Sequence, residues 1–306
     1  MNTQEQYIGF IGAGNMGKPM IRHLVEAGYR VTVSLRREEA RPEIERLGAI
    51  AVATPAEAAA QADFLLTNVT STHDVEEVLF GTHGATLTMK SGCILIDFST
   101  ISPLAVGDIA RRVKDHGGEF LDAPVSGGIT GAKAGTLSIM VGGNLAALEC
   151  ARPILACLGK TITHIGISGA GQVAKACNQL VQVINIEGIA EAFQLATRMH
   201  VNPSRVLSAI SAGMAGSKML DLMGPKMAAR NFSAGIEARL HAKDFGLVGQ
   251  TIDQLGISMP AAAAVRAQLE QLLAEGWGYD DTSSLLRVLE VQSANNGAST
   301  QKAKST

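Results

Sequence analysis

The sequence predicts a two-part protein: a doubly wound, mainly parallel α/β domain followed by an all-helical domain, with a long helix joining them. Three observations predict this organisation. Short apolar strands alternate with helices through the first half, a glycine-rich loop follows the first strand, and helix follows helix after Gly169. The chain of 306 residues exceeds the usual size of a single core. We therefore expect domains at 1–166 and 167–292, and a small, polar, disordered tail at 293–306.

Composition excludes several classes of partner. Hydrophobic residues make up 46% of the chain, charged residues make up 18%, and the net charge is −2, so nothing indicates a nucleic-acid or membrane-binding surface. Apolar runs are too short to span a bilayer, and the polar start MNTQEQ has no signal-peptide core. Neither the four cysteines nor the seven histidines have metal-ligand spacing. We expect a cytoplasmic protein with reduced, buried cysteines and no metal.

The first strand, Ile8–Ile11, runs into a G-x-G-x-x-G loop that opens a helix ending at Gly28. The first glycine permits the sharp turn, the second lets the backbone reach a pyrophosphate, and the third allows close helix–strand packing. The free N–H groups of the helix start then face the phosphates. We predict that a dinucleotide binds to the loop residues Gly12, Ala13, Gly14, Asn15, Met16 and Gly17.

The second strand, Arg30–Leu35, ends where an NAD site usually offers an acid to the ribose hydroxyls. Arg36 and Arg37 stand there instead, and two guanidiniums suit a 2′-phosphate. The alternative is that these arginines are solvated, or paired with the acids at 38 and 39. We predict NADP as the preferred cofactor, with NAD as the alternative.

Strands and helices continue to alternate up to Asp122. Strands are expected at about 50–53, 64–68, 93–98 and 119–122. Helices are expected at about 38–48, 74–80 and 104–116, and another helix is expected to start at Pro55. Ligands of such sheets bind beyond the carboxyl ends of the strands. Two loops lie there, Thr67–Thr72 and Ser99–Pro103, and their hydroxyls and amides either contact the cofactor or cap turns.

A further loop, Asp122–Gly128, leads into a patterned glycine-rich stretch. Ser126 and the amides of Gly127 and Gly128 would form a compact nest for an anion such as a substrate carboxylate. The alternative is a glycine-rich turn that joins the dinucleotide half to further strands.

The long helix opens with Gly169 and Gly171 and continues towards His200. Lys175 lies three and four positions before Asn178 and Gln179, so the cation and the amides share one helix face. Such a pair could polarise a carbonyl oxygen, although most lysines are simply solvated.

Beyond this helix, further helices are expected at about 203–210, 243–255, 260–275 and 281–291. The long helix is apolar on all sides, which favours burial against a second copy in a homodimer or homotetramer. Four methionines gather between 214 and 227, which is typical of core filling or of an adaptable pocket wall.

Four blocks of the sequence resemble those of the β-hydroxyacid dehydrogenases, a family that includes 3-hydroxyisobutyrate dehydrogenases and tartronate-semialdehyde or glyoxylate reductases. The blocks are IGFIGAGNMGKPM, DFSTISP, DAPVSGGITGAKAGTLSIMVGG and GAGQVAKACNQ, and HAKDF is similar to a fifth. They keep the order and spacing of the family from about residue 8 to residue 290.

The resemblance implies a Rossmann domain, an all-helical domain and the junction helix between them. It also implies catalysis by Lys175 with Asn178 beside it, a substrate carboxylate held at 126–128, and cofactor contacts from Thr100 and Lys243, with Asp244 in support. Where many members have two asparagines, this chain has Asn178-Gln179, which leaves open which amide orders the substrate.

The implied reaction is reversible hydride transfer between a nicotinamide and a small 3-hydroxy acid or its semialdehyde, with Lys175 as general acid and base. Two other functions are weighed. A non-catalytic dinucleotide-binding module would be expected to lack this lysine, and an imine reductase usually carries a different group there. Substrate choice depends on the helical part, including 211–217 and 236–239, where Arg239 could bind a second carboxylate.

Overall fold

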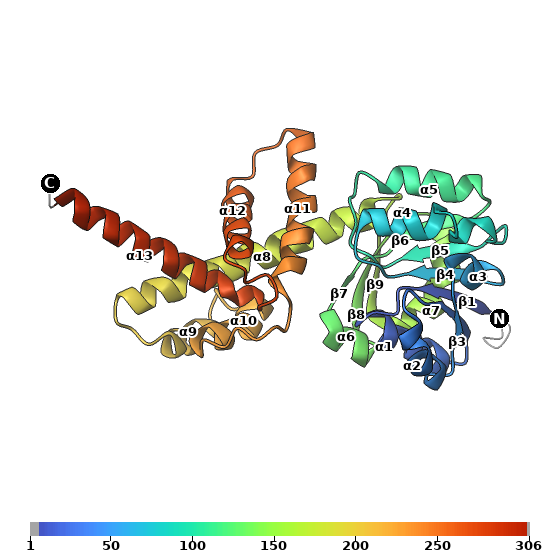
Figure 1. Ribbon diagram of the computed structural model, residues 1–306, viewed down its shortest axis with the longest axis horizontal. Helices are drawn as coiled ribbons and strands as arrows, with labels where there is room; N and C mark the ends of the chain where they lie inside the picture. The colour runs from blue at the N-terminus through green and yellow to red at the C-terminus, as the bar shows by residue number, and fades with distance from the viewer. Residues whose placement is uncertain (1–5, 305–306) are drawn as a thin grey trace. The chain divides into compact units, whose positions relative to one another are not determined.

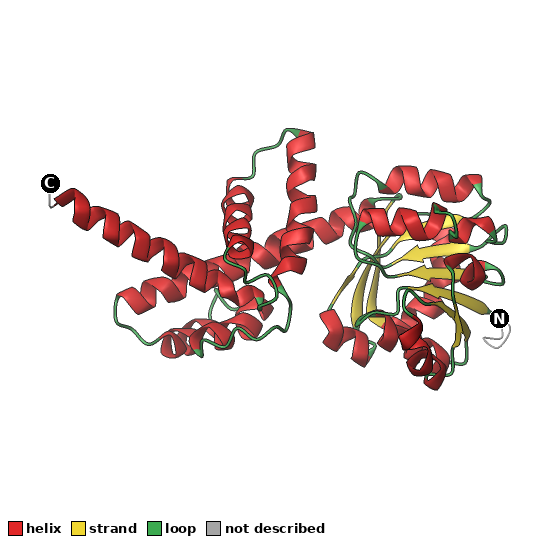
Figure 2. Cartoon of the chain, viewed as in Figure 1, coloured by secondary structure: helices red, strands yellow, loops and turns green. Residues whose placement is uncertain are grey.

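The computed structural model describes residues 6–304 of the chain, with side chains up to residue 294. The chain divides into two compact units, Met1–Lys175 and Ala176–Thr306. In Figure 2 the first unit contains both strands and helices, whereas the described part of the second is built from helices. The predicted fold class is confirmed. The unit boundary lies inside the long helix rather than before it.

The described strands of the first unit form one sheet in the order β3-β2-β1-β4-β5-β6-β8-β7, with β9 paired to β8. Strands β1 to β6 are parallel, β8 is antiparallel to β6 and β7, and β9 is parallel to β8. Figure 1 labels all of these strands except β2. They are β1 (Tyr7–Ile11), β2 (Arg30–Ser34), β3 (Ile50–Val52), β4 (Phe64–Thr67), β5 (Ile94–Asp97), β6 (Glu119–Asp122), β7 (Val125–Ser126), β8 (Leu137–Gly142) and β9 (Gly159–Gly166).

Helices cover both faces of this sheet (Figure 1). They are α1 (Gly17–Glu26), α2 (Arg41–Arg46), α3 (Pro55–Ala59), α4 (Thr72–Phe80), α5 (Val106–Asp115), α6 (Gly128–Ala134) and α7 (Leu145–Leu158), with 3₁₀ turns η2 (Glu38–Ala40) and η3 (Ala85–Leu87). One core joins the sheet to α1, α2 and α7, and the other joins it to α4 and α5. Leu66 lies in the first core and its neighbour Leu65 in the second, because successive strand residues point to opposite faces.

The long helix α8 (Ala170–Arg198) begins in the first unit and continues into the second. The second unit also holds α9 (Pro203–Ser211), α10 (Lys218–Ala228), α11 (Ala238–Leu255), α12 (Pro260–Ala274), the 3₁₀ turn η4 (Thr282–Ser284) and α13 (Leu285–Lys304). Its core gathers Phe193 of α8, Met223 and Met227 of α10, and Phe245 of α11. Two of the four clustered methionines therefore fill the core, whereas Met214 is fully exposed.

Several sequence expectations were wrong in detail. No sequence prediction was made for α6, β7, β8, α7, β9 or α10, and α11 begins at Ala238 rather than at Lys243. The last helix starts after η4 and continues to Lys304, where a helix end at Val291 and a disordered tail were expected. Of the four cysteines, all free, only Cys93 is buried, and burial raises its pKa to about 12.

Candidate active site

The loop between β1 and α1 has the geometry of a dinucleotide cradle. Gly12 has a φ of +109°, and an added Cβ there would lie 2.1 Å from the carbonyl oxygen of Asn68. A Cβ on Gly17 would lie equally close to the Gly12 oxygen, so neither position can carry a side chain. Gly14, in contrast, has no atom within 4 Å of its added Cβ. The residue before α1, Met16, provides no side-chain cap. Open space and uncapped amides at a helix start suit a pyrophosphate.

Arg36 and Arg37 form an exposed bend just after β2. Their guanidinium groups have no ion pair or hydrogen bond with any described residue. Glu38, which could have neutralised them, is instead bonded to Arg41, and this bond lowers the pKa of Glu38. Two cations are thus available at the strand end where a ribose would lie.

Hydroxyl groups in the loops after β4 and β5 bond to the protein itself. The Thr67 hydroxyl donates to Asp97 (2.7 Å), and the Ser99 hydroxyl accepts the amide of Val69 (2.9 Å). Ser71 caps α4, and the Thr72 hydroxyl accepts the amide of Ser102. These four hydroxyls therefore bond within the protein, and Ser71 among them caps a helix. Thr100 is half-buried, and the backbone groups of its neighbours Ser99 and Ile101 are bonded to Gln172.

Asp97 is completely buried at the end of β5. Burial raises the pKa of this carboxyl to about 6, and the charge of Asp122 adds to that, although hydrogen bonds from Ser99 and Thr67 act in the opposite direction. Its Oδ2 atom has no hydrogen-bond partner among the described residues. The carboxyl therefore fixes the two loops through one oxygen only.

The start of α8 is held tightly against the sheet. Asp122 at the end of β6 accepts the amides of Gly169 (2.8 Å) and Gln172 (2.9 Å) through its two oxygens. A Cβ on Gly171 would lie 2.5 Å from the carbonyl oxygens of both Asp122 and Met140, which explains the glycine. No role was predicted for Asp122 or Gln172 from the sequence. The signal for Gln172 is its position three residues before Lys175 on the same helix face.

Lys175 is brought to the predicted carboxylate nest. Its side chain is only 7% exposed, and its Nζ donates to the carbonyl oxygen of Val125 at 2.9 Å. The next residue, Ser126, is half-buried, and its hydroxyl has no hydrogen bond to any described residue. Gly127 and Gly128 follow with φ of +129° and +59° and are exposed. The buried Lys175 side chain is thus bonded to the residue that directly precedes Ser126 and the two exposed glycines.

The amide pair on α8 is connected to α11 in the second unit. Asn178 donates to the side-chain oxygen of Gln179 at 2.9 Å, and Gln179 donates to Asp244 at 2.7 Å. The other oxygen of Asp244 is 2.8 Å from the ammonium group of Lys243. Gln179 is 3% exposed and both of its polar atoms are bonded, whereas Asn178 is half-buried. Sequence spacing alone could not distinguish the two amides.

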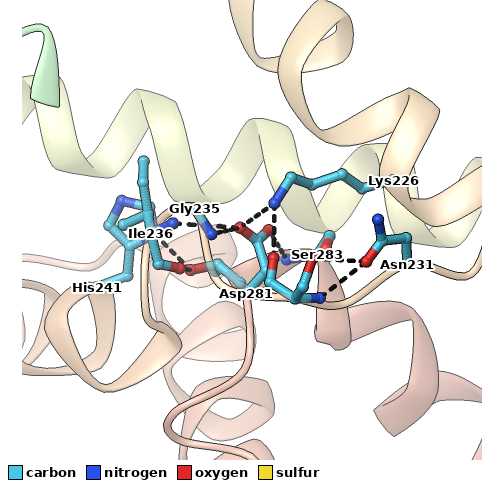
Figure 3. Close-up of polar contacts among 9 residues, drawn as sticks. Lys226, Asn231, Gly235, Ile236, His241, Asp281 and Ser283 are labelled. Carbon is cyan, nitrogen blue, oxygen red and sulfur yellow. Dashed lines mark hydrogen bonds and ion pairs between the residues drawn. The ribbon is translucent and has the colours of Figure 1, made fainter. Parts of the chain in front are cut away.

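The loop that leads into α11 is anchored by a buried carboxylate (Figure 3). Asp281 accepts hydrogen bonds from the ammonium group of Lys226 (2.7 Å) and from the backbone amides of Gly235 (2.8 Å) and Ile236 (3.2 Å). Burial raises the pKa of Asp281, but these bonds outweigh it and hold the pKa below its usual value. The nearby His241 shares a 2.8 Å hydrogen bond with the hydroxyl of Thr282. This network fixes the start of α11 and thereby the position of Lys243 on that helix.

Within 6–304, no helix is both long and apolar enough to cross a membrane. No three His, Cys, Asp or Glu side chains of the described chain gather closely enough to hold a metal ion.

Family models match nearly the whole chain. Residues 7–166 match the NAD binding domain of 6-phosphogluconate dehydrogenase, and residues 169–289 match the NAD-binding domain of NADP-dependent 3-hydroxyisobutyrate dehydrogenase. These matches agree with the cradle at the first helix and establish a nicotinamide cofactor.

Individual relatives agree with the family models. The chain is 39% identical to 2-hydroxy-3-oxopropionate reductase of Escherichia coli, over 93% of this chain and 97% of that protein. It is 32% identical to human mitochondrial 3-hydroxyisobutyrate dehydrogenase, over 92% and 86%. The solved structure of Mycobacterium tuberculosis 3-hydroxyisobutyrate dehydrogenase with L-serine matches with a TM-score of 0.87 and 30% identity, covering 93% and 99%. With its dinucleotide cradle and buried lysine, the chain belongs to the β-hydroxyacid dehydrogenase family of NAD(P)-dependent oxidoreductases that act on CH–OH groups.

Proposed function

We propose that this enzyme interconverts a small 3-hydroxy acid and its semialdehyde, with Lys175 as the general acid and base. The observation that carries this proposal is the bond from the buried Lys175 ammonium to Val125, directly before Ser126. A cation buried beside an accessible hydroxyl and two glycine amides suits a substrate that carries a carboxylate and a reacting oxygen.

Each residue of this group has a defined task in the proposed mechanism. The Ser126 hydroxyl and the amides of Gly127 and Gly128 bind the substrate carboxylate. A bound nicotinamide supplies the hydride in reduction and takes it in oxidation. In reduction, Lys175 as ammonium donates a proton to the oxygen on which negative charge develops, and in oxidation the neutral amine accepts that proton. The carbonyl of Val125 orients Nζ throughout.

Asn178, rather than Gln179, is the amide that we assign to the reacting oxygen. Lys175 and Asn178 lie three residues apart on one continuous helix, so their side chains share a face. Gln179 already uses its oxygen on Asn178 and its nitrogen on Asp244. Gln179 therefore supports Asn178, and this replaces the direct substrate contact expected for it.

NADP is the preferred cofactor in this proposal. Glu38 is bonded to Arg41 rather than to Arg36 or Arg37, and residues 34–37 at the end of β2 include no carboxylate that could bind ribose hydroxyls. The 2′-phosphate of NADP would gain charge-assisted hydrogen bonds from both. The family resemblance adds Thr100 and Lys243 as further cofactor contacts.

The names of the relatives narrow the proposed substrate class. The Escherichia coli relative is named for 2-hydroxy-3-oxopropionate, and the Mycobacterium tuberculosis structure contains L-serine. Both are three-carbon carboxylates with an oxygen on carbon 3. We propose the same class for this enzyme. The carboxylate nest binds one end of the substrate, and Lys175 exchanges a proton with the oxygen on carbon 3 at the other end.

We further propose a cytoplasmic homodimer or homotetramer. Val181 and Leu195 of α8 are 67% and 65% exposed and lie on one stripe of the helix, with Gly188 between them. An added Cβ on Gly188 would meet nothing within 4 Å, so its own chain gives no reason for a glycine there. A second copy that packs closely on this stripe would provide one.

The deciding experiment is a panel of substrates assayed with each cofactor separately. It comprises 3-hydroxyisobutyrate, 2-hydroxy-3-oxopropionate, glyoxylate, L-serine and succinic semialdehyde, each with NAD(H) and NADP(H). We expect turnover of at least one three-carbon or branched 3-hydroxy acid, with the higher kcat/KM for NADP(H). Absence of nicotinamide-linked turnover throughout the panel would favour a dinucleotide-binding module instead.

A further inference from the structure

The side chain of Gln172 joins the first turn of α8 to the loop after β5. Its Nε2 donates to the carbonyl oxygen of Ser99 at 2.7 Å, and its Oε1 accepts the amide of Ile101 at 3.1 Å. These are the residues on either side of Thr100. The side chain is 1% exposed, so no water competes for these bonds. One amide thus holds the backbone before and after Thr100.

The helix end that carries Gln172 is itself immobilised. Its backbone amide donates to Asp122, which also holds Gly169. The backbone at Gly171 is pressed against two carbonyl oxygens, with no room for a Cβ. One turn further along, Lys175 donates to Val125. The Ser99–Ile101 loop and Lys175 are therefore both positioned by the same fixed first turn of α8.

We infer that Gln172 is a positioning residue that sets the Thr100 loop, and with it the cofactor, in register with Lys175. The inference rests on the proposed function, in which Thr100 contacts the cofactor and Lys175 exchanges the proton. Hydride transfer requires the cofactor and the proton donor to meet one substrate carbon and its oxygen in a narrow range of geometries. A shared anchor in the first turn of α8 gives both groups a common frame.

A purely structural role makes a different prediction. If the bonds of Gln172 were only structural, their loss would lower the stability of the protein. The cofactor affinity and the turnover of the molecules that remain folded would not change. Thr86 provides a matched control, because its buried hydroxyl donates to the carbonyl oxygen of Leu79 at 2.8 Å in the same unit. Thr86→Val removes that bond without contacting the Ser99–Ile101 loop or α8.

The test compares Gln172→Met, which keeps the length of the side chain but loses both bonds, with Thr86→Val in the full-length enzyme. Tm is measured by calorimetry, the Kd of NADPH by titration without substrate, and kcat and KM with the best substrate of the panel. We expect Gln172→Met to raise the Kd about tenfold and to lower kcat about 10- to 100-fold. Thr86→Val should lower Tm yet keep both constants within about twofold of wild type.

Gln172→Glu gives a second readout through pH. When protonated, the glutamic acid can accept from Ile101 and donate to Ser99, as the amide does. When ionised, it has no proton for the Ser99 carbonyl. The NADPH Kd of this variant should approach that of wild type at about pH 5 and diverge as pH rises, and it decides the matter if Gln172→Met does not fold.

Two outcomes separate this inference from the proposed function. Wild-type Kd and kcat in Gln172→Met, or a Gln172→Glu affinity that follows wild type at every pH, would overturn the positioning role. If no protein of the set turned over a hydroxy acid, the proposed function would fail. The NADPH titrations would still report whether Gln172 holds the cofactor loop.

Discussion

Lys175 differs from an ordinary lysine because it is buried and bonded to a backbone carbonyl. General acid–base groups typically contribute about 10²–10⁴-fold to rate, so Lys175→Met should lower kcat by that range. The Kd of NADPH should stay close to wild type. Lys160→Met removes an exposed lysine of the same unit and serves as the control. Turnover of Lys175→Met within about tenfold of wild type would exclude the proposed role.

The amide pair offers a second test at the scale of single residues. Asn178→Ala should lower kcat about 100-fold, because a group aimed at the reacting oxygen is lost. Gln179→Leu should cost about tenfold, since Asn178 then loses one of its restraints. If Gln179 acts only through Asn178, the double variant should be no slower than Asn178→Ala alone. If the loss of kcat in the double variant equalled the product of the two single losses, the two amides would instead be independent substrate contacts.

Cofactor choice is also set by individual side chains. Arg36→Ala and Arg37→Ala should each lower kcat/KM for NADPH by about 10- to 100-fold and leave kcat/KM for NADH within about threefold, because only NADPH carries the 2′-phosphate. Arg46→Ala, an exposed arginine on the following helix, is the control. Parallel losses with both cofactors would mean that these arginines do not read the phosphate.

At the scale of elements, Asp281 joins α10, the loop before α11 and η4. Asp281→Ala removes the partner of Lys226 and the acceptor of three backbone N–H groups. It should lower the free energy of unfolding by about 2–4 kcal/mol, below the full cost of breaking a buried pair because Lys226 is partly exposed. Trp277 is the only tryptophan and lies in this unit, so its fluorescence in urea reports the transition.

The same carboxylate predicts a pH dependence. Its pKa is below the usual value in the folded protein, so its stabilisation is present above the unfolded pKa near 3.9 and is lost as pH falls through the folded value. The stability difference between wild type and Asp281→Ala should therefore be constant above about pH 5 and shrink below about pH 4. Asp253→Ala, which affects an exposed ion pair with Arg266, should change stability by less than about 1 kcal/mol.

How far the sequence predicts each element depends on whether its signal is local. The glycine loop at 12–17 and the helix start at Gly169 are local patterns, and both were predicted correctly. Strand β7 has two residues and depends on pairing with β8, and β9 has exposed residues that mask its alternation. The bond from Lys175 to Val125 spans fifty positions, so only the family resemblance could suggest that these segments meet.

At the scale of the whole molecule, the exposed stripe on α8 predicts self-association. Light scattering after gel filtration should give the mass of a dimer or tetramer. Leu195→Glu combined with Val181→Glu should shift the mass towards the monomer, because charges would be buried in the proposed contact. Leu87→Glu, which introduces the same charge at an exposed leucine of η3 and not on α8, should leave the mass unchanged. A monomeric wild-type protein would refute this proposal.

The division of the chain at Lys175 also matters for recombination between relatives. The dinucleotide loop, Ser126 and Lys175 are encoded before the boundary, whereas Asn178, Gln179 and the acid at 244 are encoded after it. A crossover placed between Lys175 and Asn178 would exchange the amide pair together with the α11 acid that holds it, so the Gln179–Asp244 bond would stay within one parent sequence. The boundary between the units thus leaves the proposed proton donor and the carboxylate nest on one side and the amide pair with its α11 acid on the other, and each set can be taken from a different parent.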